Sequence, residues 1–208
     1  IAPDVILGLS LKEQGFFDIY PAEKERWYVK APVFSFNKIR GLDAYLTPEM
    51  KSTGEAIGYD RTMTRALYKA LQASGMKLQN YGTVLATIAD RDKEEALPLI
   101  RRFYRLGFNI EATAGTATFL KENGIRTHVL GKISDGSHEI LDSIRSGYVS
   151  YIINTRSIHS SVHAQDGAAI RRCAVENGVT VFTSLDTVRV LLDVLEETTL
   201  AVSTIHAE

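Results

Sequence analysis

The stretch that decides the fold is Asn109-Ile110-Glu111-Ala112-Thr113-Ala114-Gly115-Thr116. It predicts a short buried strand over Phe108–Ala112, followed by a tight Thr-Ala-Gly-Thr turn. A helix is expected to begin at about Ala117 and to run towards Gly124. The first N–H groups of such a helix lack intrahelical acceptors, and the helix dipole adds positive charge beside them. The turn therefore suits a phosphate or another small anion. An ordinary capped strand-to-helix turn that binds no ligand would have the same sequence pattern.

Alternation of strand and helix continues from Gly82 to the end of the chain, with glycine at most of the predicted helix ends. Strands are expected at Val84–Ile88, Phe108–Ala112, Arg126–Leu130, Val149–Asn154 and Val179–Thr183, with a last apolar strand around Leu200–Ser203. Helices are expected over 116–123, 138–146, 164–176 and 184–197, and another ends at Gly107. This order predicts an α/β fold: a five-stranded, mainly parallel sheet with helices on both faces.

Residues 1 to about 58 do not have the pattern of a complete domain. A short helix is expected over Val5–Leu11, and two β segments at Trp27–Lys30 and Val33–Phe36. Two strands and a helix cannot easily bury both of their faces, so we expect this part to pack against material outside the sequence. A helix over Asp60–Gly75 and a polar connector at Met76–Tyr81 follow, and a domain boundary is expected near the connector.

The composition limits the classes of function. The 208 residues are 45% hydrophobic and 24% charged with a net charge of -1, which argues against nucleic-acid binding through a basic surface. A single cysteine, Cys173, excludes an internal disulfide framework and fits a reducing compartment. No apolar run approaches the roughly 18 residues that span a bilayer, and no signal peptide is seen. We expect a cytoplasmic protein that does not enter a membrane, and a chain that is cut from a longer one.

Polar side chains gather where the predicted strands end. In a parallel sheet of this kind, ligands bind beyond the carboxyl ends of the strands. The residues that follow the five strands in turn are Thr87, Asp90 and Lys93; Thr113, Gly115 and Thr116; Lys132; Asn154, Thr155 and Arg156; and Thr183 and Ser184. Three cations, several hydroxyls and a glycine turn on one rim predict a phosphate pocket.

Several common sites are missing from the sequence. It has no Gly-x-x-x-x-Gly-Lys-Ser/Thr loop and no Gly-x-Gly-x-x-Gly after a strand, so nucleotide hydrolysis and dinucleotide binding are unsupported. Its five histidines are spread out, and no acid or cysteine completes a metal set beside them. Cys173 lies in a helical pattern and is expected to be an inert buried residue. We therefore expect neither a metal site nor catalytic residues.

Two parts of the chain resemble a known family. The strings Phe36-Asn37-Lys38 and Pro48-Glu49-Met50-Lys51-Ser52-Thr53-Gly54-Glu55 are similar to a segment in the carboxyl-terminal half of the carbamoyl-phosphate synthase large chain, just past the metal ligands of its second ATP-grasp unit. The matches to its allosteric domain are Asp92-Lys93, Gly107-Phe108, Ala112-Thr113, Gly115-Thr116-Ala117, Gly124-Ile125, Lys132 and Tyr151-Ile152-Ile153-Asn154-Thr155. The resemblance implies a partial α+β ATP-grasp tail at 1–75 and a methylglyoxal-synthase-like, Rossmann-like effector domain at 81–208.

The implied function is regulatory. In that family this domain binds nucleotide effectors such as UMP or IMP and alters ATP use during carbamoyl phosphate synthesis from bicarbonate and glutamine-derived ammonia, for pyrimidine and arginine biosynthesis. The ATP and metal segments would precede Ile1, so the fragment is expected to be non-catalytic and free of cofactors, whereas the parent ligase uses ATP with Mg or Mn and K. The implied partners are the rest of the large chain and the glutaminase small subunit, and the resemblance allows a homo-oligomer through the allosteric domain.

The resemblance also assigns contacts to the effector. By position they fall on Thr87, Lys93, Thr113, Thr116, Lys132 and Asn154, with Gly115 in the same turn. Arg156 stands where a nucleotide-binding relative has a smaller hydroxyl residue. Because a guanidinium suits additional phosphate oxygens, we expect the pocket to accept PRPP as well as UMP.

Two other functions stay open at this point. A free-standing methylglyoxal synthase would need an aspartate in the loop after the third strand, and the equivalent position here is Ser137, with Asp135 as the alternative acid. The remaining alternative is an oligomerisation module whose anion pocket is vestigial.

Overall fold

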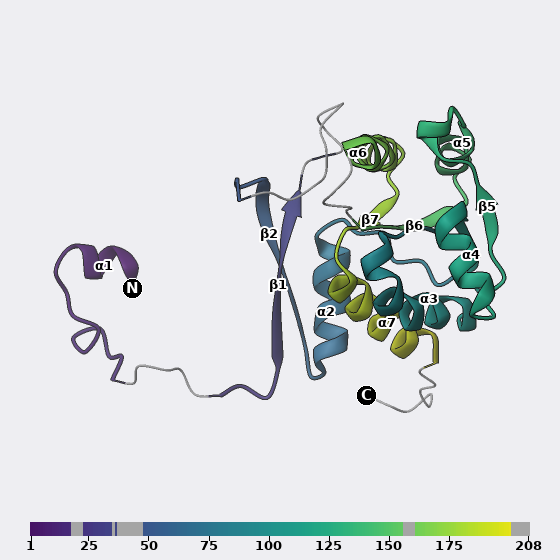
Figure 1. Cartoon of the computed structure of the whole chain (residues 1–208). Coiled ribbons are helices and arrows are strands. Elements are labelled where there is room, and N and C mark those ends of the chain that lie inside the picture. The colour runs from purple at the N-terminus through teal and green to yellow at the C-terminus, as the bar shows by residue number, and fades with distance from the viewer. Residues whose placement is uncertain (18–22, 35, 37–47, 156–160, 201–208) are drawn as a thin grey trace.

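The computed structural model describes residues 1–17, 23–34, 36, 48–155 and 161–200. Within them the chain forms a short helix, a two-stranded antiparallel sheet packed on one helix, and an α/β body (Figure 1). The first elements are α1 (Ala2–Ile6), β1 (Trp27–Phe34), β2 (Ser52–Asp60) and α2 (Met63–Ala73). Helix α1 lies away from all the others, and none of its residues is buried.

Five strands form the sheet of the α/β body within the described residues. They lie side by side in the order β5-β4-β3-β6-β7, and every pairing is parallel. The strands are β3 (Thr83–Thr87), β4 (Asn109–Thr113), β5 (His128–Leu130), β6 (Val149–Asn154) and β7 (Thr180–Phe182). The predicted parallel α/β sheet is therefore confirmed.

Helices cover both faces of this sheet, as predicted (Figure 1). Helices α3, α4 and α7 contribute to the hydrophobic cluster on one face, and α5 and α6 to the cluster on the other. The helices of the body, with its two short 3-10 turns, are η2 (Asp90–Asp92), α3 (Lys93–Arg105), α4 (Ala114–Glu122), η3 (Ile133–Asp135), α5 (Glu139–Arg145), α6 (Ser161–Glu176) and α7 (Leu185–Leu200).

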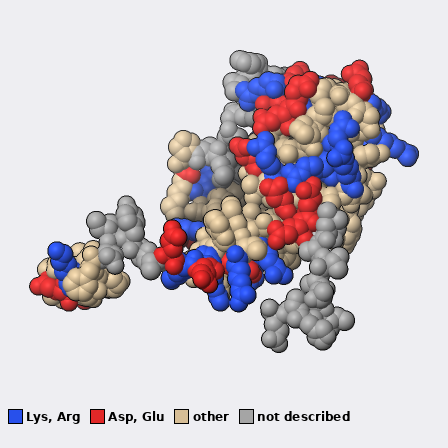
Figure 2. Space-filling view, turned by 90° about the horizontal axis from the view of Figure 1, so that it is seen from below, with Lys and Arg blue, Asp and Glu red and all other residues tan. Residues whose placement is uncertain are grey.

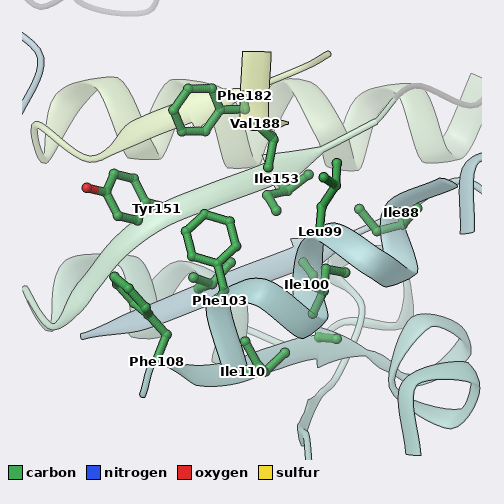
Figure 3. Packing of buried hydrophobic residues seen from close by; sticks show 14 of the residues in the cluster. Ile88, Leu99, Ile100, Phe103, Phe108, Ile110, Tyr151, Ile153, Phe182 and Val188 are labelled. Carbon is green, nitrogen blue, oxygen red and sulfur yellow. The ribbon is translucent and has the colours of Figure 1, made fainter. Parts of the chain in front are cut away.

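The two faces are fixed by the alternation of side chains along the strands. On β3, Val84 and Ala86 point into the first cluster while Leu85 points into the second. The first cluster holds a set of aromatic rings between the sheet and the helices (Figure 3). The ring of Phe103 meets that of Phe108 edge to face at 5.3 Å and lies 5.8 Å from that of Tyr151. Burial of these large side chains holds α3 onto the centre of the sheet.

The amino-terminal sheet differs from its prediction. The two expected β segments are one strand, β1, which runs through Pro32, and its partner β2 was not predicted. Pro32 is tolerated because a two-stranded sheet consists of edges only. Strand β2 lacks the usual alternation of apolar residues, because its buried position is Gly58, which carries no apolar side chain. Packing on α2, rather than β propensity, holds this strand in place.

Several helix boundaries also correct the predictions. Helix α1 spans Ala2–Ile6, so the helix predicted over Val5–Leu11 is wrong beyond Ile6. Helix α2 begins after Asp60, which belongs to β2. Helix α4 begins at Ala114 rather than near Ala117, so the predicted turn is itself the first turn of the helix. The last predicted strand is wrong at Leu200, which ends α7; its other residues, 201–203, lie outside the described part of the chain.

The connector between α2 and the body is fastened to the sheet. The hydroxyl of Tyr151 accepts a hydrogen bond from the Gln79 N–H at 2.6 Å and donates one to the Gln79 carbonyl at 2.7 Å. The Ser150 hydroxyl donates to the Tyr81 carbonyl at 2.8 Å. Burial raises the pKa of Tyr151 to about 12, so the phenol keeps its proton and both bonds well above neutral pH.

Charges of both signs are interspersed on the face seen in Figure 2. Between α3 and α7, Arg102 donates to Glu196 at 2.8 and 2.7 Å and to Asp193 at 2.6 Å. The guanidinium lowers the pKa of Glu196 below its ordinary value by hydrogen bonding. None of the helices in the described ranges is long and apolar enough to cross a membrane.

Substitution of Gly58 tests the packing of the small sheet. A Cβ at this position would lie 2.1 Å from the Ala66 carbonyl oxygen and 2.4 Å from the Ala70 nitrogen, and neither backbone atom can rotate away. We expect Gly58→Ala to lower the free energy of unfolding by about 1–3 kcal/mol, measured by urea denaturation.

Gly54→Ala on the same strand is the matched control. A Cβ at Gly54 would meet only the Val33 Cβ at 4.0 Å, an ordinary contact. The free energy of unfolding of this variant should equal or slightly exceed that of the wild type, because glycine destabilises a strand relative to alanine. Equal effects of the two substitutions would contradict the close approach of β2 to α2.

Candidate anion-binding site

The candidate site lies where the order of the strands reverses. From the central strand β3 the chain steps outwards through β4 to β5, then crosses to β6 on the other side of β3 and steps outwards to β7. The connections after β3 and β6 therefore leave in opposite directions, which opens a crevice at the carboxyl ends of these strands. A pocket of about 160 Å³ fills this crevice, many times the volume that one water needs.

The structure brings seven of the eight predicted site residues together around this pocket. They are Thr87, Lys93, Thr113, Gly115, Thr116, Lys132 and Asn154. The eighth, Arg156, lies outside the described residues. Thr155 and Asp90 of the same rim also line the pocket. Thr183 and Ser184, which follow β7, are not among its lining residues, because β7 is at the edge of the sheet.

Lys93 is held in place by two partners. Its Nζ lies 2.7 Å from a carboxylate oxygen of Asp90 and donates to the Gly115 carbonyl at 2.9 Å. The Lys93 side chain is 16% exposed, whereas that of Asp90 is 94% exposed. An ammonium has three N–H donors, so these two partners leave one for a ligand. The positive charge is thus fixed at the amino-terminal end of α4.

The start of α4 offers backbone donors in the same place. Thr113 is its N-cap residue, but its side chain makes no capping hydrogen bond. At the equivalent position of α2, the Thr62 hydroxyl does cap, because it accepts from the Arg65 N–H at 3.3 Å. The first N–H groups of α4 are therefore not satisfied by Thr113, and an anion in the pocket can accept from them.

The Thr116 hydroxyl makes a structural contact that the sequence did not indicate. The Thr116 side chain is 2% exposed, and its hydroxyl accepts from the Ile88 N–H at 3.2 Å and lies 3.4 Å from the Ile88 carbonyl. The hydroxyl thus ties the segment after β3 to α4. The Thr155 hydroxyl, just after β6, accepts a hydrogen bond from the Ala89 N–H at 2.8 Å and so ties the same segment to the end of β6. Both threonines shape the wall of the pocket.

Lys132 projects from a loop that the backbone holds closed. Its carbonyl accepts from the N–H groups of Asp135 and Ser137 at 3.1 and 3.2 Å. The Ser134 N–H donates to Asp166 on α6 at 3.2 Å, which links this loop to the other side of the pocket. Within the described residues, the Lys132 ammonium has no hydrogen-bond or ion-pair partner. A ligand would therefore be its first strong partner there.

Asn154 and Thr87 line the pocket and are hydrogen-bonded to each other. The Asn154 amide nitrogen donates to the Thr87 hydroxyl at 2.7 Å, and the Asn154 side-chain oxygen accepts from Arg171 at 2.7 Å. Arg171 was not predicted from the sequence, because an arginine in a helix usually faces solvent. The available signal was Gly167, a glycine inside the same helix, which indicates a close approach. Three residues that do line the pocket, Asp166, Ile140 and Ile170, were also not predicted.

The two positions on which the lyase alternative depends do not line the pocket. Ser137 and Asp135 are absent from its lining, and Asp135 is exposed. The acids that line it are Asp90 and Asp166. In the part of the chain that the structure describes, no three His, Cys, Asp or Glu side chains are grouped closely enough to hold a metal ion. Cys173 is buried, as expected, and burial raises the pKa of its thiol.

The sheet order and the pocket together define a doubly wound α/β domain with a pocket at its topological switch point. Comparison with known families agrees with this class, because residues 95–183 match the model described as an MGS-like domain. An MGS-like domain is thus found in this chain. The match runs from α3 to β7, and it includes Thr113, Lys132 and Asn154 of the pocket.

Replacement of Thr116 tests its structural role. Thr116→Val keeps the shape of the side chain but removes the acceptor of the buried Ile88 N–H, so we expect a loss of about 1–3 kcal/mol in the free energy of unfolding. Thr118→Val on the exposed side of α4 is the control, since it makes the same chemical change in the same helix. Urea denaturation of both variants would show a large loss only for Thr116; two equal losses would refute the role.

Proposed function

We propose that this chain is the carboxyl-terminal regulatory part of a carbamoyl-phosphate synthase large chain, and that its pocket binds a phosphorylated nucleotide effector such as UMP, IMP or PRPP. The MGS-like match supports an effector domain of this kind without being specific to that enzyme. The observation that carries the proposal is the convergence of Lys93, Lys132 and the uncapped start of α4 on one pocket.

The chemistry of these groups favours a phosphate. Charge-assisted hydrogen bonds from two ammonium groups are stronger than neutral ones, and the helix dipole adds to the same field. The lining of the pocket also includes two apolar side chains, Ile140 and Ile170, which belong to the second cluster. A phosphate at the lysines and an apolar ring at the isoleucines would contact both kinds of side chain, which fits a nucleotide better than inorganic phosphate.

In this proposal the pocket has a regulatory role, and no reaction is catalysed there. A lyase that makes methylglyoxal needs an aspartate in the loop after β5. The equivalent position is Ser137, which has no carboxylate, and Asp135, the alternative acid, lies outside the pocket lining. In the proposed assembly, residues 1–75 are the end of an ATP-grasp unit. The rest of the large chain, the glutaminase subunit and ATP with its metal ions would then belong to the complete cytoplasmic enzyme.

Thermal unfolding with each effector tests the proposal. A ligand that binds only the native state stabilises it by about 2.7 kcal/mol at a concentration 100-fold above its dissociation constant. For a chain of this size, that corresponds to a rise of roughly 5–10 °C in the unfolding temperature. UMP and IMP should be compared with uridine and inosine, and PRPP with ribose; each of these lacks the phosphate and should produce a much smaller rise.

Single lysine replacements locate the binding. Lys93→Met and Lys132→Met should each weaken UMP binding by about tenfold or more, because each removes a charged donor to the phosphate. Lys121→Met is the control, since Lys121 is exposed near the far end of α4. Isothermal titration calorimetry gives the three affinities, and equal weakening by all three would point to non-specific attraction.

Two other results would support the alternatives. Turnover of dihydroxyacetone phosphate to methylglyoxal by the purified chain would identify a lyase. Absence of any thermal shift with the three effectors, together with a stable oligomer in sedimentation, would favour an oligomerisation module.

A further inference from the structure

A chain of hydrogen bonds runs from inside the protein to the pocket. It begins at Arg171 on α6, which is 6% exposed, and passes through Asn154 at the end of β6, which is 5% exposed. Arg171 Nη1 donates to Asn154 Oδ1 at 2.7 Å, and Asn154 Nδ2 donates to Thr87 Oγ1 at 2.7 Å. Thr87 and Asn154 line the pocket, whereas Arg171 does not.

The first member of this chain sets the direction of every bond in it. A guanidinium has donors and no acceptor, so the amide of Asn154 must turn its oxygen towards Arg171. The amide nitrogen then faces Thr87, and the Thr87 oxygen must accept. The hydroxyl proton of Thr87 is left to point elsewhere. The Ile153 carbonyl, at 3.4 Å, is beyond the usual range for a hydroxyl donor.

From this geometry we infer that Arg171 is a positioning residue for the effector site, and that it makes Thr87 a hydrogen-bond donor towards the pocket. The site then selects ligands that present acceptor oxygens, as a phosphate does, and disfavours ligands that present donors at this point. The inference rests on the proposed binding of a phosphorylated effector.

Gly167 supports this role for Arg171. It precedes Arg171 by one helical turn, and a Cβ placed on it would lie 3.0 Å from Arg171 Nη1 and 3.2 Å from Asn154 Oδ1. Glycine weakens the interior of a helix relative to alanine. Its presence here leaves the space through which the guanidinium reaches Asn154.

Two simpler roles for Arg171 make different predictions. As a purely structural residue, it would change the stability of the domain but leave the affinity of the folded protein for its effector unchanged. As a source of long-range positive charge, it would favour any anion whether or not Thr87 carried a hydroxyl. A double-mutant cycle between Arg171 and Thr87 separates these cases, because it measures whether the two residues act through each other.

The experiment measures UMP affinity by calorimetry for the wild type, Arg171→Met, Thr87→Val and the double variant. Each single substitution is expected to weaken binding by about tenfold, and the double variant by about tenfold rather than a hundredfold. Arg172→Met is the matched control, because Arg172 is the exposed neighbour on the same helix, and it should bind UMP as the wild type does.

The inference would be overturned if Arg171→Met lowered UMP affinity by a further tenfold in the Thr87→Val background. It would also be overturned if the single variant Arg171→Met bound UMP with unchanged affinity. If Arg171→Met does not fold, Arg171→Gln serves in the same cycle, because an amide can either donate or accept and so no longer fixes the direction of the chain. Failure of the proposed function is visible separately, since the wild type would then bind none of UMP, IMP and PRPP.

Discussion

The hydrogen bond between Asn154 and Thr87 joins the ends of strands β6 and β3, at the point where the strand order of the sheet reverses. Every residue of β6 is buried, and so is most of β3, so packing on both faces fixes where these two ends lie. The pocket is a consequence of this topology: the segments after β3 and β6 must part, and the polar groups at their ends face the gap between them. Side chains from α4, the loop after β5 and α6 complete the walls.

The two lysines reach the pocket in different ways, and this affects the cost of binding. Lys93 is already ordered by Asp90 and the Gly115 carbonyl, so a ligand need not immobilise it. Its partner Asp90 is 94% exposed, so water can solvate that carboxylate when a phosphate takes its place beside the ammonium. Lys132 stands on a loop with fixed backbone, but its side chain has no partner within the described residues. Binding must therefore order that side chain.

Much of this arrangement could be predicted from the sequence because it depends on periodicity. The alternation of apolar strands and helices predicted a parallel sheet, and a parallel sheet brings the residues after its strands to one edge, which placed Lys93, Thr113 and Asn154 around one pocket. Features that depend on contacts distant in sequence could not be predicted. Strand β2 has Gly58 at its buried position and so lacks the apolar signal. The hydroxyl of Thr116 is used by Ile88, and the burial of Arg171 depends on Asn154, 17 residues earlier.

Strand β6 connects the pocket to the amino-terminal part of the chain. Its last residue, Asn154, lies at the pocket, and three residues earlier Tyr151 holds both backbone groups of Gln79. The neighbouring Ser150 holds the Tyr81 carbonyl. A strand packed on both faces transmits a displacement along its length better than it absorbs one, because closely packed protein interiors have low compressibility. A ligand that shifts Asn154 therefore acts on the same element to which the connector is fastened, and the connector leads directly to α2 and the small sheet.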